Sequence, residues 1–164
     1  MSSFSSFVAQ SIGHFAEKQV LLAYKSDPNF FVFKRYEPYK RIGKPDSKGV
    51  FRAINQGKSG CDFSFFTQSG KSGLFELKSR KGTRISKSSL DEAQRRDLTL
   101  MEEMGFFSFV LVNLRDKESL WFVVPWSLWD MGQKKSHNLK DLQTIGKQCP
   151  LNKRGHPLFF DCLP

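Results

Sequence analysis

The 164-residue chain lacks the features that define several large classes of protein. It has no run of about 18 apolar residues, which argues against a membrane-spanning helix. Its first residues, Met1-Ser2-Ser3-Phe4, have neither the basic start nor the apolar segment of a signal peptide, so we expect a cytoplasmic protein. The three cysteines are widely spaced and form no Cys-x-x-Cys pair, which indicates neither a disulfide framework nor a zinc site. The chain also contains no internal repeat and no Gly-rich phosphate loop.

Acidic residues are scarce relative to basic ones, and the imbalance is concentrated in three segments. The chain has 26 Lys and Arg but only 16 Asp and Glu, a net charge of +10. Residues 34–58 contain eight basic residues and two acids, residues 71–96 contain eight and three, and residues 134–154 contain six and one. This charge predicts a polyanionic partner, most simply nucleic acid, bound less tightly as salt rises. Solubility alone, or an anionic membrane surface, would also account for it.

Aromatic residues are plentiful, and the hydrophobic pattern predicts one α/β domain over residues 1–164. Aromatics make up 14% of the chain, and 17 of them are Phe, enough for a large core. The expected elements are helix 3–25, strand 30–36, a basic loop or projecting hairpin at 38–58, a hairpin of 59–66 and 73–79, a basic turn at 80–84, helix 90–104, strands 106–113 and 119–124, a short helix from Pro125 and another at 138–145. Ser89 and Glu92 match a capping box for helix 90–104, and Gly105 would end it. The order predicts helices packed on a mixed sheet, followed by a tail with little pattern.

The predicted hairpin of 59–66 and 73–79 carries the most informative charged residues. Side chains at positions i and i+2 of a strand share a face, so Glu76 and Lys78 project together. If Asp62 faces the same way across the hairpin, two carboxylates and one ammonium group meet. Two carboxylates suit Mg²⁺, and a nearby lysine could orient or deprotonate a water molecule or stabilise charge on a phosphate. The alternative is a solvated surface ion pair of little consequence.

Two further polar residues interrupt apolar helix faces. Glu17 follows Gly13 by one turn, and a glycine there would let a phosphate approach closely, although a glutamate at the border of an apolar face usually turns toward solvent. Gln94 lies on the apolar stripe of helix 90–104. A buried amide needs a polar partner, which is either the charged face of the hairpin or nearby backbone.

These residues, in this order, resemble the PD-(D/E)XK nuclease superfamily, and within it the small Holliday junction resolvases of the Hjc-like and RecU-like types. The resemblance covers roughly residues 10–125 and rests on four matches: Gly13-x-x-x-Glu17, Asp62, Glu76-Leu77-Lys78-Ser79 and Gln94. It implies a restriction-endonuclease-like three-layer core, with a central mixed β-sheet flanked by helices. It also implies that Asp62 and Glu76 bind Mg²⁺, for which Mn²⁺ can substitute, and that Lys78 assists the attacking water. Glu17 and Gln94 would complete the catalytic set.

The same resemblance implies a homodimer acting on a four-way DNA junction, with no membrane partner. The residues expected to contact DNA are Lys58, Ser79, Arg80, Lys81, Arg84 and Lys87. The chain departs from the pattern in two ways. Cys61 stands where the motif has proline, and the basic segment 38–58 is shorter than the stalk-bearing insertion of RecU-like proteins. The extension 130–164 has no counterpart in the pattern.

The sequence therefore predicts a Mg²⁺-dependent, structure-selective DNA endonuclease, most specifically a junction resolvase. One alternative is the same chemistry on flaps, ends or duplex DNA. A second is a nucleic-acid-binding module without catalysis, in which the acids are structural. A third is a basic scaffold that presents Trp121, Trp126 and Trp129 to a partner, although these tryptophans suit core or dimer contacts better.

Overall fold

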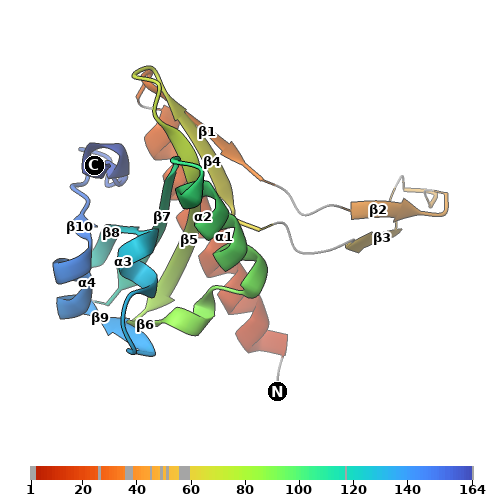
Figure 1. The fold of residues 1–164 in the computed structure, drawn as a ribbon. Helices are drawn as coiled ribbons and strands as arrows, with labels where there is room; N and C mark the ends of the chain where they lie inside the picture. The colour runs from red at the N-terminus through yellow and green to blue at the C-terminus, as the bar shows by residue number, and fades with distance from the viewer. Residues whose placement is uncertain are drawn as a thin grey trace.

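The computed structural model describes residues 3–25, 27–35, 39–44, 46–48, 50, 52–55, 60–116 and 118–163, with side chains from His14 onward except at 39–41 and 52–55. Its centre is a six-stranded sheet (Figure 1). In sheet order the strands are β1 (Phe30–Lys34), β4 (Phe63–Thr67), β5 (Ser72–Lys81), β7 (Phe107–Arg115), β8 (Ser119–Pro125) and β10 (Lys147–Gln148). Only β5 and β7 pair in parallel, so the sheet is mixed, as predicted.

Helical segments cover both faces of the sheet. On one face, α1 (Ser3–Lys25) and the C-terminal 3-10 helix η2 (Phe159–Cys162) pack on a core that is rich in Phe. On the other face lie α2 (Glu92–Glu103), α3 (Trp126–Asp130) and α4 (Leu139–Ile145). The expected three-layer core is therefore confirmed. Trp121, Trp126 and Trp129 are all buried within it, so they present no surface to a partner.

Two smaller elements complete the architecture. Strands β6 (Arg84–Ser86) and β9 (Ser136–Asn138) pair beside the 3-10 turn η1 (Lys87–Ser89). Strands β2 (Tyr39–Ile42) and β3 (Arg52–Asn55) form an antiparallel hairpin that extends away from the central sheet (Figure 1). We call β2 and β3 the arm. Of the two interpretations of segment 38–58, the projecting hairpin is confirmed for its described residues.

Two local predictions were wrong, and the C-terminal tail has structure that the sequence did not predict. Helix α2 begins at Glu92 after the N-cap Asp91, and its capping box pairs Asp91 with Gln94 instead of Ser89 with Glu92. The residues before it form η1, and Leu90 is extended. Strand β5 continues through Arg80 and Lys81, which reduces the basic turn to Gly82 (φ 105°) and its neighbour. The tail, in which the sequence showed little pattern, contributes β10 and η2 to the fold.

The remaining predicted boundaries agree closely with the structure. Helix α1 spans the predicted residues, and Gly105 ends α2 with a φ of 81°. All three cysteines are buried and free. Among the described residues, no helix combines the length and the apolar character needed to cross a membrane.

Candidate active site

The β4–β5 hairpin brings Asp62 and Glu76 together. Phe63 pairs with Phe75, so the next residues outward on the two strands, Asp62 and Glu76, lie opposite each other. The Asp62 backbone N–H donates to Glu76 Oε2 at 2.9 Å, and the Leu77 N–H donates to Asp62 Oδ2 at 3.3 Å. Both carboxyl groups therefore accept hydrogen bonds from backbone N–H groups at the end of the β4–β5 pairing, and these bonds hold them in place.

Lys78 and Gln94 complete this cluster. The Lys78 ammonium donates to Glu76 Oε1 at 2.6 Å and to Gln94 Oε1 at 3.2 Å. The Gln94 amide donates to Glu76 Oε1 at 2.7 Å, while its oxygen also accepts the Asp91 N–H at 3.1 Å. The sequence allowed two alternative partners for Gln94, the charged face of the hairpin or nearby backbone. In the structure Gln94 contacts both.

Burial makes both carboxyl groups unusually weak acids. Glu76 is 1% exposed, and burial raises its pKa from 4.5 to about 8, with the charge of Asp62 adding to the effect and Lys78 opposing it. Burial also raises the pKa of Asp62, while Lys78 and a hydrogen bond to Glu76 oppose the rise. The two carboxyl groups together thus retain a proton near neutral pH, and a divalent cation could replace that proton.

The donor set fits a hard cation. Asp62 and Glu76 offer carboxylate oxygens, the ligands that Mg²⁺ prefers, and Mg²⁺ usually binds one or two carboxylates and keeps several waters. Within the part of the chain that the structure describes, no group of three or more His, Cys, Asp or Glu is clustered tightly enough to coordinate a metal alone. The site therefore suits an ion whose remaining ligands are water and phosphate oxygens.

Glu17 lies at the edge of this site. Its Oε2 accepts from the Lys34 ammonium of β1 at 2.5 Å and lies 3.5 Å from His14 Nδ1. It thus forms an ion pair with Lys34 instead of turning freely to solvent. Burial is the main cause of the raised pKa of Asp62, and the charge of Glu17 adds to it. Gly13 falls in the part of α1 whose side-chain surroundings are not described.

Two of the residues expected to contact DNA are engaged elsewhere. Ser79 lies on the opposite face of β5 from Lys78, and its hydroxyl donates to Oδ1 of the buried Asn113 at 3.0 Å. Lys87 is 8% exposed, and its ammonium donates to the carbonyl oxygens of Met131 and Gly132 at 2.8 and 3.2 Å. Lys87 therefore holds the segment after α3 in place. The prediction that it contacts DNA was wrong, because its ammonium group is buried against backbone carbonyls.

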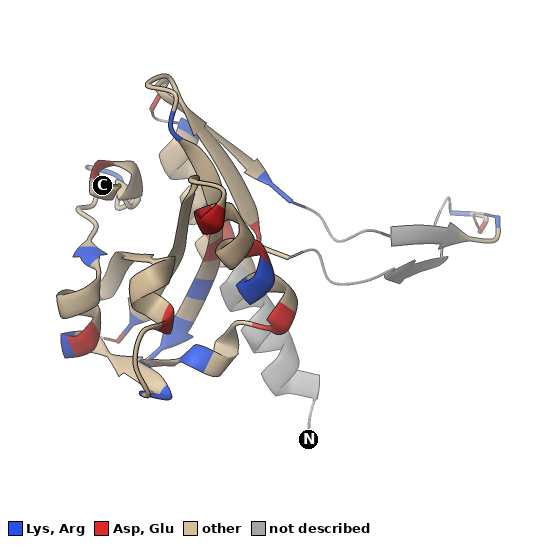
Figure 2. Ribbon diagram, in the orientation of Figure 1, with Lys and Arg blue, Asp and Glu red and all other residues tan. Residues whose placement is uncertain are grey.

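The other expected cations form a track that leaves the site. Arg80 shares a face of β5 with Glu76 and Lys78, and it is exposed, as are Lys81 and Arg84. Figure 2 shows basic residues along the part of β5 that follows the site. Lys58 lies outside the described residues.

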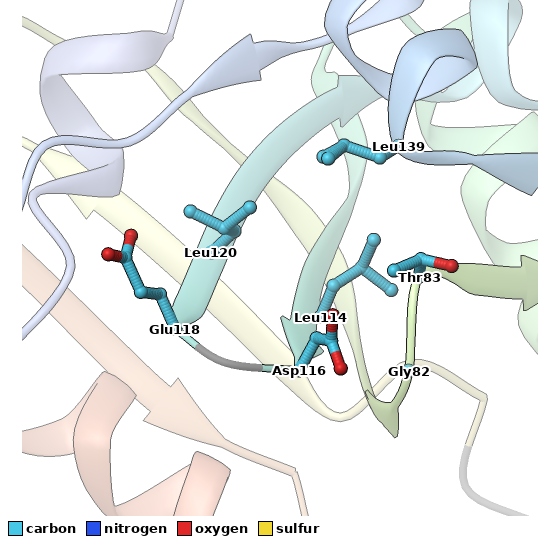
Figure 3. A pocket seen from close by; sticks show the side chains of 7 residues that line it. All are labelled: Gly82, Thr83, Leu114, Asp116, Glu118, Leu120 and Leu139. Atoms are coloured by element: carbon cyan, nitrogen blue, oxygen red, sulfur yellow. The ribbon is translucent and has the colours of Figure 1, made fainter.

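The structure also has cavities that are separate from this cluster. One of about 230 Å³ lies beside the β7–β8 turn and is lined by Leu114, Leu120 and Leu139, with Asp116 and Glu118 near its edge (Figure 3). No residue of the carboxylate cluster lines it. We therefore place the candidate site at the β4–β5 hairpin and not in this cavity.

Two residues near the site were not predicted. Arg35 follows β1, and its guanidinium donates to Asp97 of α2 at 3.1 Å. Its backbone N–H donates to the Asp62 carbonyl at 2.7 Å. Arg35 and Asp97 are 62 positions apart in the sequence, and neither belongs to a recognisable motif. Only the folded chain therefore reveals their contact.

The central six-stranded mixed sheet, with helices on both faces, is the α/β fold class that the sequence predicted. In a comparison with solved structures, the chain is similar to Archaeoglobus fulgidus Hjc, a Holliday junction resolvase from an archaeal hyperthermophile. The TM-score is 0.51 with 14% sequence identity, over 82% of this chain and 93% of that chain. Neither a protein-family model nor a curated protein matches the chain. At this identity the likeness establishes the fold, and the site depends on the geometry described above.

Proposed function

We propose that the protein is a Mg²⁺-dependent endonuclease that hydrolyses phosphodiester bonds in branched DNA, with the four-way junction as its preferred substrate. The observation that carries this proposal is the meeting of Asp62, Glu76 and Lys78 in one partly buried cluster. The similarity of the fold to that of a Holliday junction resolvase supports the choice of substrate.

Each residue of the cluster has a distinct role in the proposed reaction. Asp62 and Glu76 would hold the metal ion, which is either Mg²⁺ or Mn²⁺. When bound, the ion supplies a polarised phosphoryl oxygen and a water of lowered pKa. The Lys78 ammonium is placed to orient a water molecule or to balance charge on the phosphate. Gln94 holds the Glu76 carboxylate and the Lys78 ammonium in register, and Glu17 adds negative charge at the edge of the site.

DNA would follow the exposed cations. Arg80 continues the face of β5 that carries Lys78, and Lys81 and Arg84 extend the positive charge around the turn at Gly82. The arm provides a second basic region, because Lys44 and Lys48 near its tip are exposed. Two separated basic regions suit a substrate with more than one duplex arm.

Four DNA substrates test the proposal: a four-way junction, a flap, a splayed end and a linear duplex, each with Mg²⁺ or with EDTA. We expect Mg²⁺-dependent cleavage that is fastest on the junction and is abolished in Asp62→Asn and Glu76→Gln. Faster cleavage of flap, end or duplex would keep the chemistry and change the substrate. Salt-sensitive binding that is indifferent to Mg²⁺ and yields no products would favour a non-catalytic binding module.

We also propose that the protein acts as a homodimer, because cutting two strands of a junction symmetrically requires two sites and each chain provides one. A candidate contact surface lies on the face of β1 and β4 that α1 does not cover. Phe31, Phe33 and Phe66 are 50%, 54% and 52% exposed there, with the rings of Phe33 and Phe66 6.1 Å apart. We call these three residues the aromatic face.

Helix α2 extends this surface. Asp97 of this helix packs on the turn before β4, and β7, which follows the helix, starts at Phe107, paired with Gly73 of β5 near the far end of the hairpin. Leu100 and Met104 follow Asp97 by three and seven residues, on the same side of the helix, and both are more than half exposed.

The size of this surface favours a second copy of the chain as its occupant. With roughly 100 Å² exposed on each of the five side chains, the surface amounts to roughly 500 Å², a large fraction of the ~800 Å² that each partner buries in a standard interface. The largest apolar patch on a monomer is of about this size, roughly 300–600 Å², and it often marks an interaction site.

A further inference from the structure

A group of contacts fixes the turn that carries Asp62. Arg35, at the end of β1, donates its backbone N–H to the Asp62 carbonyl at 2.7 Å. Its guanidinium donates to Asp97 Oδ2 of α2 at 3.1 Å. The Asp97 side chain is 17% exposed and that of Arg35 is 38% exposed, so the pair is partly shielded from water. One residue thus links the backbone of Asp62 to a carboxylate on the neighbouring helix.

Asp97 also packs directly on the turn. Gly60 has a φ of 28°, and a Cβ atom there would lie 1.7 Å from Asp97 Oδ2. The space that a side chain would need at residue 60 is therefore occupied by the Asp97 carboxylate. Cys61 is fully buried, and its thiol donates to the Gln94 carbonyl at 3.6 Å. The turn before Asp62 is thus in contact with α2 at two successive residues.

Helix α2 contacts both halves of the site through residues one turn apart. Gln94 holds Glu76 and Lys78 on β5, and Asp97, three residues later, holds the turn that leads to Asp62. Arg35 and Gly60 precede and follow the segment of the chain that contains the arm, and both contact Asp97.

We propose that Asp97 is a positioning residue: through Arg35 and Gly60 it sets the position of the Asp62 carboxylate relative to Glu76. The catalytic part of this inference rests on the proposed nuclease function. Asp97 itself touches neither Glu76 nor Lys78 through any hydrogen bond or ion pair among the described residues.

The physical basis is the small tolerance of metal-assisted catalysis for misplacement. Removing the negative charge of Asp97 leaves the Arg35 guanidinium without its partner on α2 and loosens the turn that Asp62 terminates. A displacement of about 1 Å can cost about 100-fold in rate. Binding of DNA to exposed cations depends much less on such a displacement.

The test compares Asp97→Asn with Asp130→Asn. Asp130 also pairs with an arginine of α2, since Arg95 Nη1 lies 2.7 Å from its Oδ1, but this pair lies beside α3 and away from the turn. On a four-way junction with saturating Mg²⁺ we expect Asp97→Asn to lower kcat by about 10- to 100-fold with KM within about 2-fold of wild type. Asp130→Asn should leave both unchanged. Equal kcat values for the two variants would overturn the proposal.

Two further measurements separate positioning from general loss of structure. Arg35→Lys keeps a cation and should retain most of the rate that Arg35→Gln loses. Amide hydrogen exchange at Asp62 and Leu77, whose N–H groups hold the two carboxylates, should accelerate in Asp97→Asn but not in Asp130→Asn. Hydrogen exchange can be measured without cleavage. A protein without nuclease activity would refute the proposed function, and the exchange measurement alone would then decide the role of Asp97. Unchanged exchange at both amides would refute the positioning role.

Discussion

Glu76 is a carboxylic acid that is 1% exposed and hydrogen-bonded to the backbone of a residue with a second carboxyl group, Asp62. Burial raises its pKa from 4.5 to about 8. A group that holds its proton more tightly in the folded state stabilises the fold below its unfolded pKa, and that contribution is lost as pH rises through the folded pKa. The metal-free protein should therefore lose stability between pH 4.5 and about 8.

Thermal melts in EDTA at several pH values check this prediction. We expect the Tm of wild type to fall across the window, and the fall to be much smaller in Glu76→Gln, which has no proton to lose there. Glu103→Gln, a change at an exposed glutamate of α2, is the control and should keep the wild-type slope. Adding Mg²⁺ at pH 8 should raise the Tm of wild type but not of Glu76→Gln, because the ion takes the place of the proton. Parallel slopes in wild type and Glu76→Gln would contradict the assignment.

Gln94 has two separable functions, one in its helix and one in the site. It is the third helical residue of the capping box with Asp91, and it also bridges Glu76 and Lys78. Asp91→Ala removes the capping side chain and keeps Gln94, so it should cost about 1 kcal/mol of stability, or about 3 °C in Tm, with kcat preserved. Gln94→Ala should cost a similar amount of stability and also lower kcat. Calorimetry and junction cleavage measure the two effects, and equal kcat values in both variants would limit Gln94 to capping.

At the scale of elements, the sequence was informative where neighbours in the chain are neighbours in space. The hairpin joining Asp62 to Glu76 follows from alternation and a short turn, because both strands are local. The start of α2 was misplaced because two overlapping capping patterns occur within residues 89–94, and only packing selects the second. The core role of Phe159 and Phe160 could not be read from a tail without periodicity, since their partners lie on the sheet and Phe30 of β1.

The aromatic face gives a prediction at this same scale. A double change, Phe33→Ser with Phe66→Ser, removes exposed apolar area from β1 and β4 and should shift the protein from dimer to monomer. Phe15→Ser is a matched control, because Phe15 is 56% exposed but lies on α1. Light scattering over a range of protein concentrations gives the mass. A wild-type monomer, or a double variant that remains dimeric and loses DNA binding instead, would assign the aromatic face to another occupant.

Across the whole molecule, the acids of the candidate site are separated by burial from the cations expected to contact DNA. Glu76 is buried and Asp62 is partly buried, whereas Arg80, Lys81 and Arg84 are exposed, and further basic residues lie among exposed acids elsewhere on the surface (Figure 2). Exposed cations attract the DNA backbone over several ångströms, and the buried acids act on a phosphate only at contact. Affinity and catalysis should therefore respond to different residues.

This separation predicts how salt affects binding. Each neutralised phosphate contributes about 0.9 to the slope of log K against log salt on duplex DNA. Arg80→Ala with Arg84→Ala removes two cations of the track beside the site, so the slope should decrease by about 2 while Mg²⁺ binding is unchanged. Lys153→Ala with Arg154→Ala removes the same charge from the exposed C-terminal segment and should change the slope far less. Fluorescence titration of an uncleaved junction in Ca²⁺ at four salt concentrations measures both slopes. If the two double variants have the same slope, the charge acts through the whole field of the molecule and the track along β5 is not the DNA path.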